Sequence, residues 1–193
     1  MRRVILASGS PRRRELLSKI TDNFSIDVSD LEEITSKTNV NEIVLELSLL
    51  KARDIANKYK DNCIIIGADT MVSLHDKILG KPKDRQDAYQ MLRAMSNEKH
   101  QVYTGVTIIV KDEVGQSKTI SFVERSDVFV NELSDSEIEE YLNTGEPFDK
   151  AGAYGIQGKF GIYIGRIEGD YNNIVGFPIA RVYKELKKEG IYL

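Results

Sequence analysis

Three consecutive arginines, Arg12, Arg13 and Arg14, stand at the start of a predicted helix, directly after Pro11. Ser10 suits the N-cap and proline suits the first helical position, so backbone N–H groups stay free at this end of the helix. The helix dipole is also positive there. These residue types in this order predict a binding site for an anion.

The direction of each arginine follows from the helical repeat. Arg13 shares one helix face with Leu16, Leu17 and Ile20, so we expect it to point along the buried face. Arg14 falls on the other side. The alternative is that all three arginines are solvated, or that Arg13 only extends its stem past the core.

A second cation lies on an apolar helix face, in the segment NEIVLELSLLKARDIANKY. Val44, Leu47 and Ile55 form an apolar stripe, and Lys51 falls on this stripe between the last two. Lys51 must therefore meet a negative partner, or extend its ammonium past the core to water, which is the common alternative. Two inward cations from separate helices predict one shared anion.

Asp69 follows a continuous β-branched run, CIIIG, at residues 63–67. Such a run predicts a central strand buried on both faces, and α/β sheets place their ligands at the carboxyl ends of strands. The alternative is an ordinary turn or N-cap aspartate. Glu32 and Glu33 precede the long helix, and Lys81 lies in the rigid loop ILGKP, so more charged groups are available to the same site.

Carboxylates combined with several cations, without a Cys/His cluster, suit an oxygen-ligated ion such as Mg²⁺ together with a phosphorylated substrate. The matching chemistry is phosphoryl or nucleotidyl transfer, in which positioning and charge neutralisation supply most of the rate. The sequence contains neither a Walker lysine motif nor G-x-G-x-x-G. A P-loop and a standard dinucleotide site are therefore not expected.

The segment EPFDKAGAYGIQG, residues 146–158, is rich in small residues. Its glycines and alanines would let a flat ligand ring lie against the backbone, and Gln157 can both donate and accept hydrogen bonds. Spacing alone favours the alternative, a Gly-rich connection between a helix and a strand with Gln157 exposed.

The elements that position these groups alternate between strands and helices, which argues for an α/β fold with a mixed sheet. Ser134 opens one helix and Glu137 completes a capping box there. The predicted strands cover residues 4–7, 63–67, 102–110, 119–130, 161–167 and 170–175. The predicted helices cover residues 11–20, 41–60, 85–95, 134–145 and 178–190.

Composition restricts the class of protein further. The chain has 193 residues, 41% hydrophobic and 30% charged, enough for one substantial core in one or two closely packed lobes. A net charge of -3 disfavours a protein that holds nucleic acid by bulk charge. The single cysteine, Cys63, excludes a disulfide framework and a cysteine zinc site, and it fits a cytoplasmic location.

No apolar run approaches the roughly 20 residues of a membrane span, so no membrane partner is expected. A transit peptide is the alternative for the arginine-rich first fourteen residues, although the strand-like MRRVILAS and Glu15 argue against it. His100 stands at the start of a predicted strand, where an imidazole is more often structural, and it is not assigned to the candidate site.

Taken together, these motifs resemble one family, the Maf-type nucleoside triphosphate pyrophosphatases. The resemblance runs from Val4 to about Tyr183 and is carried by SGSPRRRELL, the Glu32–Glu33 pair, Lys51–Ala52, GADT, LGKP, HQVYTGV and DKAGAYGIQG. It implies an elongated mixed β-sheet flanked by helices, like that of the inosine triphosphate pyrophosphatases. It also implies a single domain, residues 1–193, with two lobes around a nucleotide-binding cleft.

The resemblance further implies hydrolysis of a nucleoside triphosphate to the monophosphate and pyrophosphate, with Mg²⁺, Mn²⁺ or Co²⁺. Asp69 matches the family's proposed acceptor for the proton of the attacking water. Glu33 matches an acidic residue that helps to hold the metal, together with Asp69. The residues that match the phosphate-binding positions are Ser8, Arg13, Lys51 and Lys81.

Arg12, Thr70 and Gln157 match the positions that distinguish the branch acting on dTTP and UTP. A sister branch, which acts on methylated GTP, lacks the GIQG ending. A neutral amide suits the edge of a pyrimidine, which offers both a donor and acceptors. MSNEKH and GFP depart from the family's usual serine-glycine turn and GLP, but neither touches the expected catalytic set.

Two functions from other classes stay open at this point. One is a nucleotide-binding regulator of cell division and septum formation without essential turnover. The other is a nucleic-acid-binding module, which the acidic balance and the lack of an aromatic-basic stripe disfavour. The expected partner is a nucleoside triphosphate and no nucleic acid, and the oligomeric state is open, with a homodimer as one option.

Overall fold

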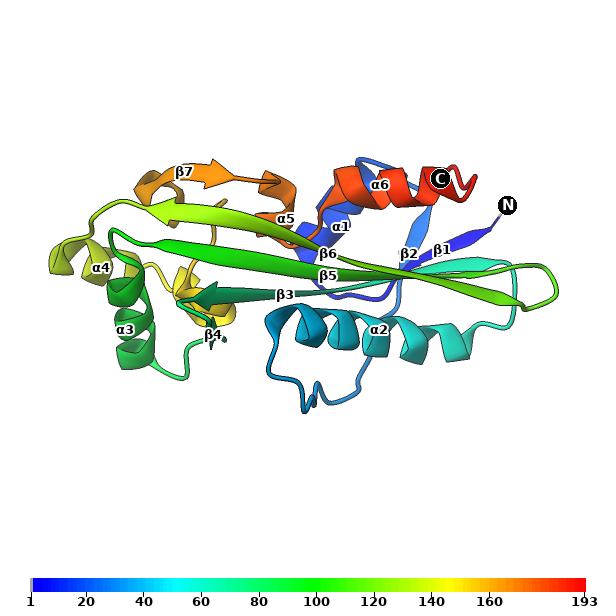
Figure 1. Cartoon of the computed structure of the whole chain (residues 1–193), viewed down its shortest axis with the longest axis horizontal. Coiled ribbons are helices and arrows are strands. Elements are labelled where there is room, and N and C mark those ends of the chain that lie inside the picture. The colour runs from blue at the N-terminus through cyan, green and yellow to red at the C-terminus, as the bar shows by residue number, and fades with distance from the viewer. Residues whose placement is uncertain (1) are drawn as a thin grey trace. The chain divides into compact units, whose positions relative to one another are not determined.

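The computed structural model describes residues 2–193 and shows a seven-stranded mixed sheet flanked by helices (Figure 1). The strands are β1 (Arg3–Leu6), β2 (Phe24–Ile26), β3 (Cys63–Leu74), β4 (Lys77–Leu79), β5 (Lys99–Lys111), β6 (Ser117–Val130) and β7 (Ile164–Glu168). Their order is β2-β1-β3-β5-β6-β7, with β4 paired to β3. β1 pairs in parallel with β2 and β3, whereas β4 and β7 pair antiparallel, which confirms the predicted mixed sheet.

The chain divides into two compact units, each with its own apolar core. The first unit comprises the chain up to Asp69, Thr104–Glu124 and Gly176–Leu193. The second comprises Thr70–Tyr103 and Arg125–Val175. Strands β3, β5 and β6 contribute residues to both units.

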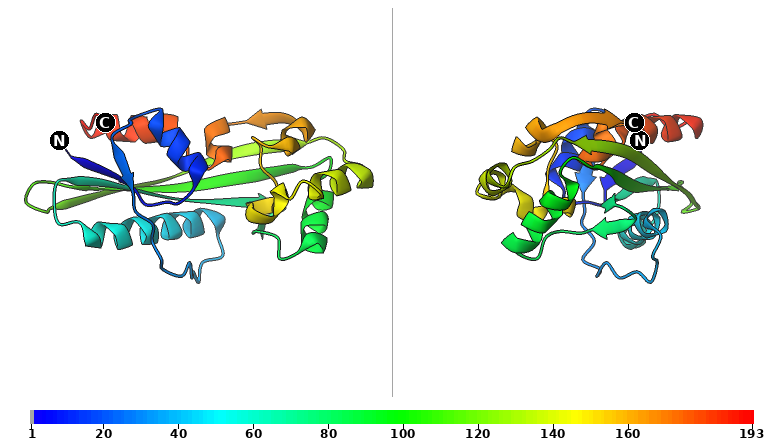
Figure 2. Two further views of the ribbon diagram at one scale, coloured as in Figure 1. Left: turned by 180° about the vertical axis from the view of Figure 1, so that it is seen from behind. Right: turned by 60° about the vertical axis from the view of Figure 1, so that its left-hand side comes forward.

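Helices cover both faces of the sheet in the first unit. They are α1 (Pro11–Ser18), α2 (Val40–Lys58) and α6 (Ile179–Lys188). Helix α2 lies on one face, and α1 and α6 lie on the other (Figures 1 and 2). Ala52 and Ile55 of α2 pack with Ile5 and Ile65 of the strands, and Cys63 is buried among them as a free thiol, as predicted.

The second unit is built from shorter elements. They are α3 (Arg85–Met95), α4 (Asp135–Leu142), α5 (Tyr171–Val175) and the 3-10 turns η1 (Glu146–Asp149), η2 (Ala151–Ala153) and η3 (Lys159–Tyr163). Helix α3 has the predicted bounds and buries Leu92 and Met95 in the core of this unit. Ser134 and Glu137 form the predicted capping box of α4. Among residues 2–193, no helix is long and apolar enough to span a membrane.

Three sequence predictions of secondary structure are wrong, the smallest being residues 161–163, which were predicted as the start of a strand but belong to the 3-10 turn η3. Strand β3 continues to Leu74 instead of ending at residue 67, because Val72, Ser73 and Leu74 pair antiparallel with β4. Asp69 therefore lies inside the strand and not at its end. Residues 171–175 form helix α5 and not a strand. At the start of this helix, the Asn172 backbone N–H donates to Asp170 Oδ1.

Candidate active site

The centre of the candidate site is a lysine held between two carboxylates. Lys51 Nζ lies 2.7 Å from Asp69 Oδ1 and 2.9 Å from Glu33 Oε1. The lysine side chain is 15% exposed, so its ammonium is largely shielded from water. Lys51 therefore meets negative partners, and the alternative of a lysine that extends to solvent is wrong.

Helix α2 and strand β3 bring this pair together for a local reason. Residues two apart in a strand face the same side, so Gly67 and Asp69 both face α2. A Cβ at Gly67 would lie 2.5 Å from the Ser48 carbonyl oxygen and 2.9 Å from the Ala52 nitrogen, so only glycine lets the helix approach so closely. Lys51, between these helical contacts, is thereby placed beside Asp69.

Arg13 contacts both a distant segment and a residue close to it in the sequence. Its Nε donates to the Gly176 carbonyl at 2.9 Å, and its Nη1 donates to Ser8 Oγ at 3.2 Å. Burial lowers the pKa of the Arg13 guanidinium from its ordinary value, while the negative charges of Asp69 and Glu33 oppose this shift. Arg13 therefore points inward, as its helical position predicted. The two carboxylates that attract its guanidinium electrostatically are the ones that Lys51 contacts.

The start of α1 has the geometry expected of an anion site. The Ser10 side chain caps the helix by accepting from the Arg13 backbone N–H at 3.5 Å, and Pro11 occupies the first turn. Ser8 is buried, and its Oγ also accepts from the Ser10 backbone N–H at 3.3 Å. The arginine side chain and the helix N-terminus thus present positive charge near the same hydroxyl.

Glu33 comes from the irregular segment between β2 and α2. Its side chain is 50% exposed, in contrast to the buried Asp69. The segment is tied to α2 by a hydrogen bond that the Thr35 hydroxyl donates to the Glu46 carboxylate. Glu33 is therefore the solvent-side carboxylate of the pair.

Asp69 retains one oxygen that could act on a ligand. Its Oδ2 is buried and has no hydrogen-bond partner among the described residues. Within residues 2–193, no group of three or more His, Cys, Asp or Glu side chains is arranged to hold a metal ion. Mg²⁺ is commonly held by one or two carboxylates plus substrate phosphates, so Glu33 and Asp69 fit a metal that arrives with a phosphorylated substrate.

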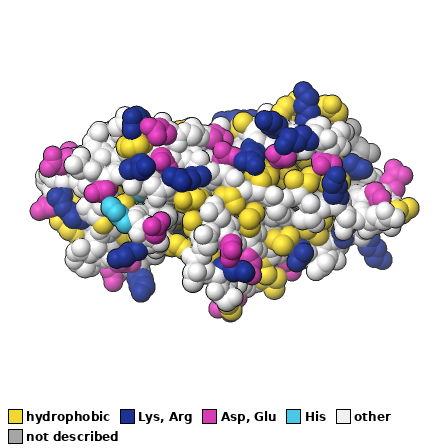
Figure 3. Space-filling model, viewed as in Figure 1, with side chains coloured by type: hydrophobic (Ala, Val, Ile, Leu, Met, Phe, Trp, Pro, Cys, Tyr) yellow, Lys and Arg dark blue, Asp and Glu magenta, His cyan; other side chains and the backbone are white. Residues whose placement is uncertain are grey.

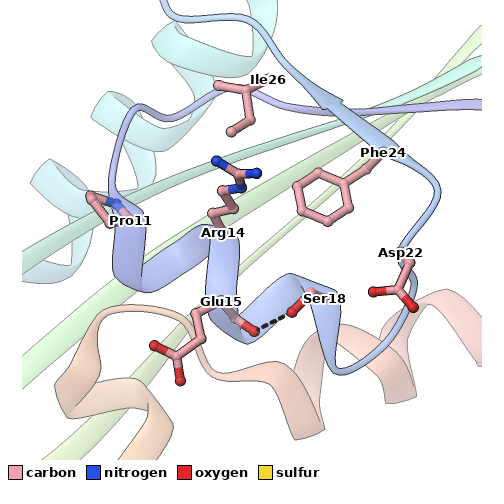
Figure 4. A pocket seen from close by; sticks show the side chains of 7 residues that line it. All are labelled: Pro11, Arg14, Glu15, Ser18, Asp22, Phe24 and Ile26. Atoms are coloured by element: carbon pink, nitrogen blue, oxygen red, sulfur yellow. Dashed lines mark hydrogen bonds between the residues drawn. The ribbon is translucent and has the colours of Figure 1, made fainter.

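The neighbouring Arg14 lies on the other side of α1, as its helical position predicted. It extends toward β2 and lines a pocket of about 540 Å³ with Phe24 and Ile26, while Glu15 and Asp22 lie at its border (Figure 4). Arg13 does not line this pocket. The pocket is therefore separate from the cluster that holds Asp69.

Three predicted site residues belong to the second unit. Thr70 is half-buried and directly follows Asp69 in β3, whereas Lys81 and Gln157 are exposed. The loops that carry Lys81 and Gln157 are joined within this unit, because the Gly152 N–H donates to the Gly80 carbonyl at 3.0 Å. The structure thus gathers Ser8, Arg13, Glu33, Lys51 and Asp69 in the first unit and the LGKP and DKAGAYGIQG motifs in the second. Arg12 is half-buried in α1.

Some contacts of the site carried no signal in the sequence. The Gly176 carbonyl that orients Arg13 comes from 163 positions along the chain. Every residue has a backbone carbonyl, so the residue type at this position does not identify it as a contact of the site. Only the close approach of the two segments identifies it.

Charges of both signs are interspersed over the face of the molecule drawn in Figure 3. On the face drawn in Figure 3, the described Lys and Arg side chains alternate with Asp and Glu, without one continuous basic patch. Proteins that hold nucleic acid by charge need such a patch. This face therefore gives no support to the nucleic-acid hypothesis.

Known proteins resemble this chain over its whole length. A curated protein of Lachnoclostridium phytofermentans named dTTP/UTP pyrophosphatase is 52% identical over 193 residues, which cover 100% of this chain and 98% of the relative. A protein of Bacillus cereus with the same name is 48% identical, with 99% and 97% coverage.

The structure of the Staphylococcus aureus Ham1 protein matches with a TM-score of 0.55 and 15% identity, over 97% of this chain and 100% of that one. This likeness concerns the fold alone. It confirms the expected mixed sheet flanked by helices. The sequence profile of the family described as Maf-like protein matches residues 3–189, so the chain belongs to the Maf-like protein family.

Proposed function

We propose that this protein hydrolyses dTTP and UTP to the corresponding monophosphates and pyrophosphate. Its relatives with this name match over nearly their full length. The observation that carries the proposal is Asp69, whose Oδ1 is held by Lys51 while its buried Oδ2 lacks a partner among the described residues. A carboxylate fixed on one side is well placed to act as a base on the other.

The triphosphate would be bound by the cations around Asp69. Arg13 and Lys51 carry positive charge that is partly shielded from water, where each contact with a phosphate oxygen is stronger than at the surface. Ser8 would add a hydroxyl contact while it orients Arg13. Lys81, in the LGKP loop of the second unit, is the further phosphate-binding residue that we propose.

The proposed reaction is an in-line displacement at the α-phosphorus. Asp69 orients a water molecule and accepts its proton at Oδ2 as the water oxygen bonds to the α-phosphorus. The bond from the α-phosphorus to the oxygen that bridges to the β-phosphorus breaks, and pyrophosphate leaves with that oxygen. Arg13 and Lys51 neutralise the negative charge that develops on the departing group.

The family and the reaction both indicate a divalent cation. Glu33 and Asp69 are the residues that would hold it, and we propose Mg²⁺ first, with Mn²⁺ or Co²⁺ as alternatives. When bound with substrate, the ion would supply further charge neutralisation at the phosphates.

The base would be selected by side chains outside this cluster. Gln157 is exposed in a Gly-rich turn, and its amide can pair with a pyrimidine edge. Arg12 and Thr70 are the other two proposed selectivity residues. We propose these two residues because their types match those of the family branch that acts on dTTP and UTP.

The direct test is release of pyrophosphate from UTP, dTTP, CTP and GTP, each with Mg²⁺, Mn²⁺, Co²⁺ or a chelator. UTP and dTTP should be hydrolysed at least about tenfold more efficiently than CTP and GTP, because groups that hydrogen-bond one base edge are left unpaired by a different base. The chelator should abolish release. Tight nucleotide binding without pyrophosphate release would instead favour the cell-division regulator.

A further inference from the structure

The turn that carries Gln157 is held from outside by side chains of the preceding segment. Within Tyr154–Gly158, the Gly158 N–H donates to the Gly155 carbonyl at 3.0 Å and closes the turn. The Gly155 N–H donates to the Tyr141 hydroxyl at 3.3 Å. Gln157 itself is exposed, so its position depends on the backbone of this turn.

The Glu146 side chain contacts the end of the turn and the residue that follows it. Its Oε2 accepts from the Lys159 backbone N–H at 3.0 Å. A Cβ added at Gly158 would lie closer to this carboxylate than Cβ atoms come to other atoms in real structures. The carboxylate therefore lies flat against the backbone that immediately follows Gln157.

Glu146 is itself firmly placed. It is half-buried, and its backbone N–H donates to Thr144 Oγ1 at 3.1 Å. Its carbonyl accepts from Lys150 Nζ at 2.7 Å, while the Lys150 stem fills the space beside Gly155. The residue that contacts the turn is thus fixed on both sides along the chain.

We propose that Glu146 is a positioning residue for the Gln157 turn and thereby controls the selectivity for the pyrimidine base. The inference rests on the proposed function, specifically on contact between Gln157 and the base. A hydrogen bond from a backbone N–H to a carboxylate is stronger than one between neutral groups, so it restrains the turn more tightly. A small displacement of Gln157 would weaken its hydrogen bonds to the base, because these bonds depend steeply on distance and angle.

The experiment compares kcat and KM for UTP and CTP in Glu146→Ala, Glu146→Gln and Gln157→Ala. Glu146→Ala should lower the preference for UTP over CTP about tenfold, mainly through KM for UTP, with kcat changed less than about twofold. Glu146→Gln keeps an acceptor oxygen and should recover most of the preference. The double variant Glu146→Ala/Gln157→Ala should be no less selective than Gln157→Ala alone.

A matched control is Glu140→Ala, which removes an exposed carboxylate from α4 and should leave the preference unchanged. If Glu146→Ala fails to fold, Lys159→Pro removes the same hydrogen bond from the donor side. Lys159 opens η3, and Gly158 before it has the extended backbone that a following proline accepts. Lys159→Pro should then lower the preference by the same factor.

Three results would overturn the inference. If Gln157→Ala alters selectivity but Glu146→Ala and Lys159→Pro do not, positioning by Glu146 is wrong and the role of Gln157 stands. If none of the three alters it, the proposed role of Gln157 is wrong as well. If Glu146→Ala lowers kcat equally for UTP and CTP, the residue affects general stability or catalysis and not the base.

Discussion

At the scale of single residues, the site depends on how each buried charge is compensated. Asp69 is buried with Lys51 as its direct partner, and Lys51 is shared with Glu33. Replacing one member of such a cluster leaves another without its counter-charge, which is costly when water is excluded. Isosteric substitutions are therefore the informative ones.

Asp69→Asn should lower kcat for UTP by about a thousandfold or more, because an amide cannot accept the proton of water. The variant should still fold, since the amide oxygen can accept from Lys51. Steady-state pyrophosphate release and circular dichroism measure the two effects. Asp61→Asn, at an exposed position before β3, is the matched control and should keep full activity. Near-normal turnover in Asp69→Asn would contradict its role as the base.

His100 makes stability depend on pH. It is buried in the second unit, its Nε2 lies 2.7 Å from the Tyr154 hydroxyl oxygen, and its Nδ1 lacks a partner among the described residues. Burial lowers the pKa of the imidazole to about 4, and the nearby charge of Asp127 only partly opposes this shift. The structural role predicted for His100 fits its buried position.

The sign of this effect follows from proton uptake. Between pH 6.5 and 4 the unfolded chain binds a proton at His100 while the folded chain does not, so the free energy of unfolding falls as the pH falls. From pH 7 to pH 5 the loss should be about 2 kcal/mol. Urea unfolding at the two pH values measures it, and His100→Gln should remove most of this pH-dependent difference. Equal losses in both proteins would show that other groups are responsible.

At the scale of elements, two glycines set the distance between helix α2 and the sheet. Gly67 of β3 faces Ser48 and Ala52, and Gly105 of β5 faces the Val44 carbonyl. A Cβ at either position would collide with helix backbone, which cannot move aside without shifting the whole helix. Because α2 carries Lys51, the geometry of the site depends on this close packing.

Gly105→Ala should therefore lower the free energy of unfolding by about 1–3 kcal/mol, the usual cost of overpacking. It should also lower kcat, because α2 must move away from β3. Urea unfolding and pyrophosphate release measure these changes. Gly80→Ala is the control for stability, since a Cβ there has nothing within 4 Å. Unchanged stability in Gly105→Ala would show that the helix shifts without cost.

At the scale of the whole molecule, binding of the proposed substrate should raise the stability of the folded protein. A ligand that binds only the folded protein stabilises it in proportion to the logarithm of its concentration. Nucleotide-dependent stability therefore reports binding without requiring turnover. The Asp69→Asn protein, which is predicted to be inactive, allows the substrate itself to be used.

UTP with Mg²⁺ at about one hundred times its Kd should stabilise the Asp69→Asn protein by about 2.7 kcal/mol. For a chain of this size the expected rise in Tm is roughly 5–10 °C. A chelator should remove most of the rise if the metal joins substrate and protein. Adding Lys51→Met should weaken the shift at the same UTP concentration. A rise that survives both changes would contradict the proposed phosphate site.

Much of the fold could be predicted from local patterns. The apolar repeat gave the bounds of α3, the capping box located α4, and Cys63 was correctly expected in a buried strand. The length of β3 and the helix at 171–175 were missed. Strand β3 is extended by pairing with β4, and Asn173 of α5 is buried through hydrogen bonds to the second unit's strands, so both depend on other segments.

The helical repeat was enough to predict that Arg13 and Lys51 share a face with apolar residues, because the faces of a helix follow from its repeat alone. The sequence also put Asp69 after a buried run of strand. The pairing of Lys51 with Asp69 and Glu33, and the contact of Arg13 with the Gly176 carbonyl, follow from the folded arrangement and not from local spacing. A partner far along the chain is chosen by packing, which spacing between neighbouring residues cannot specify.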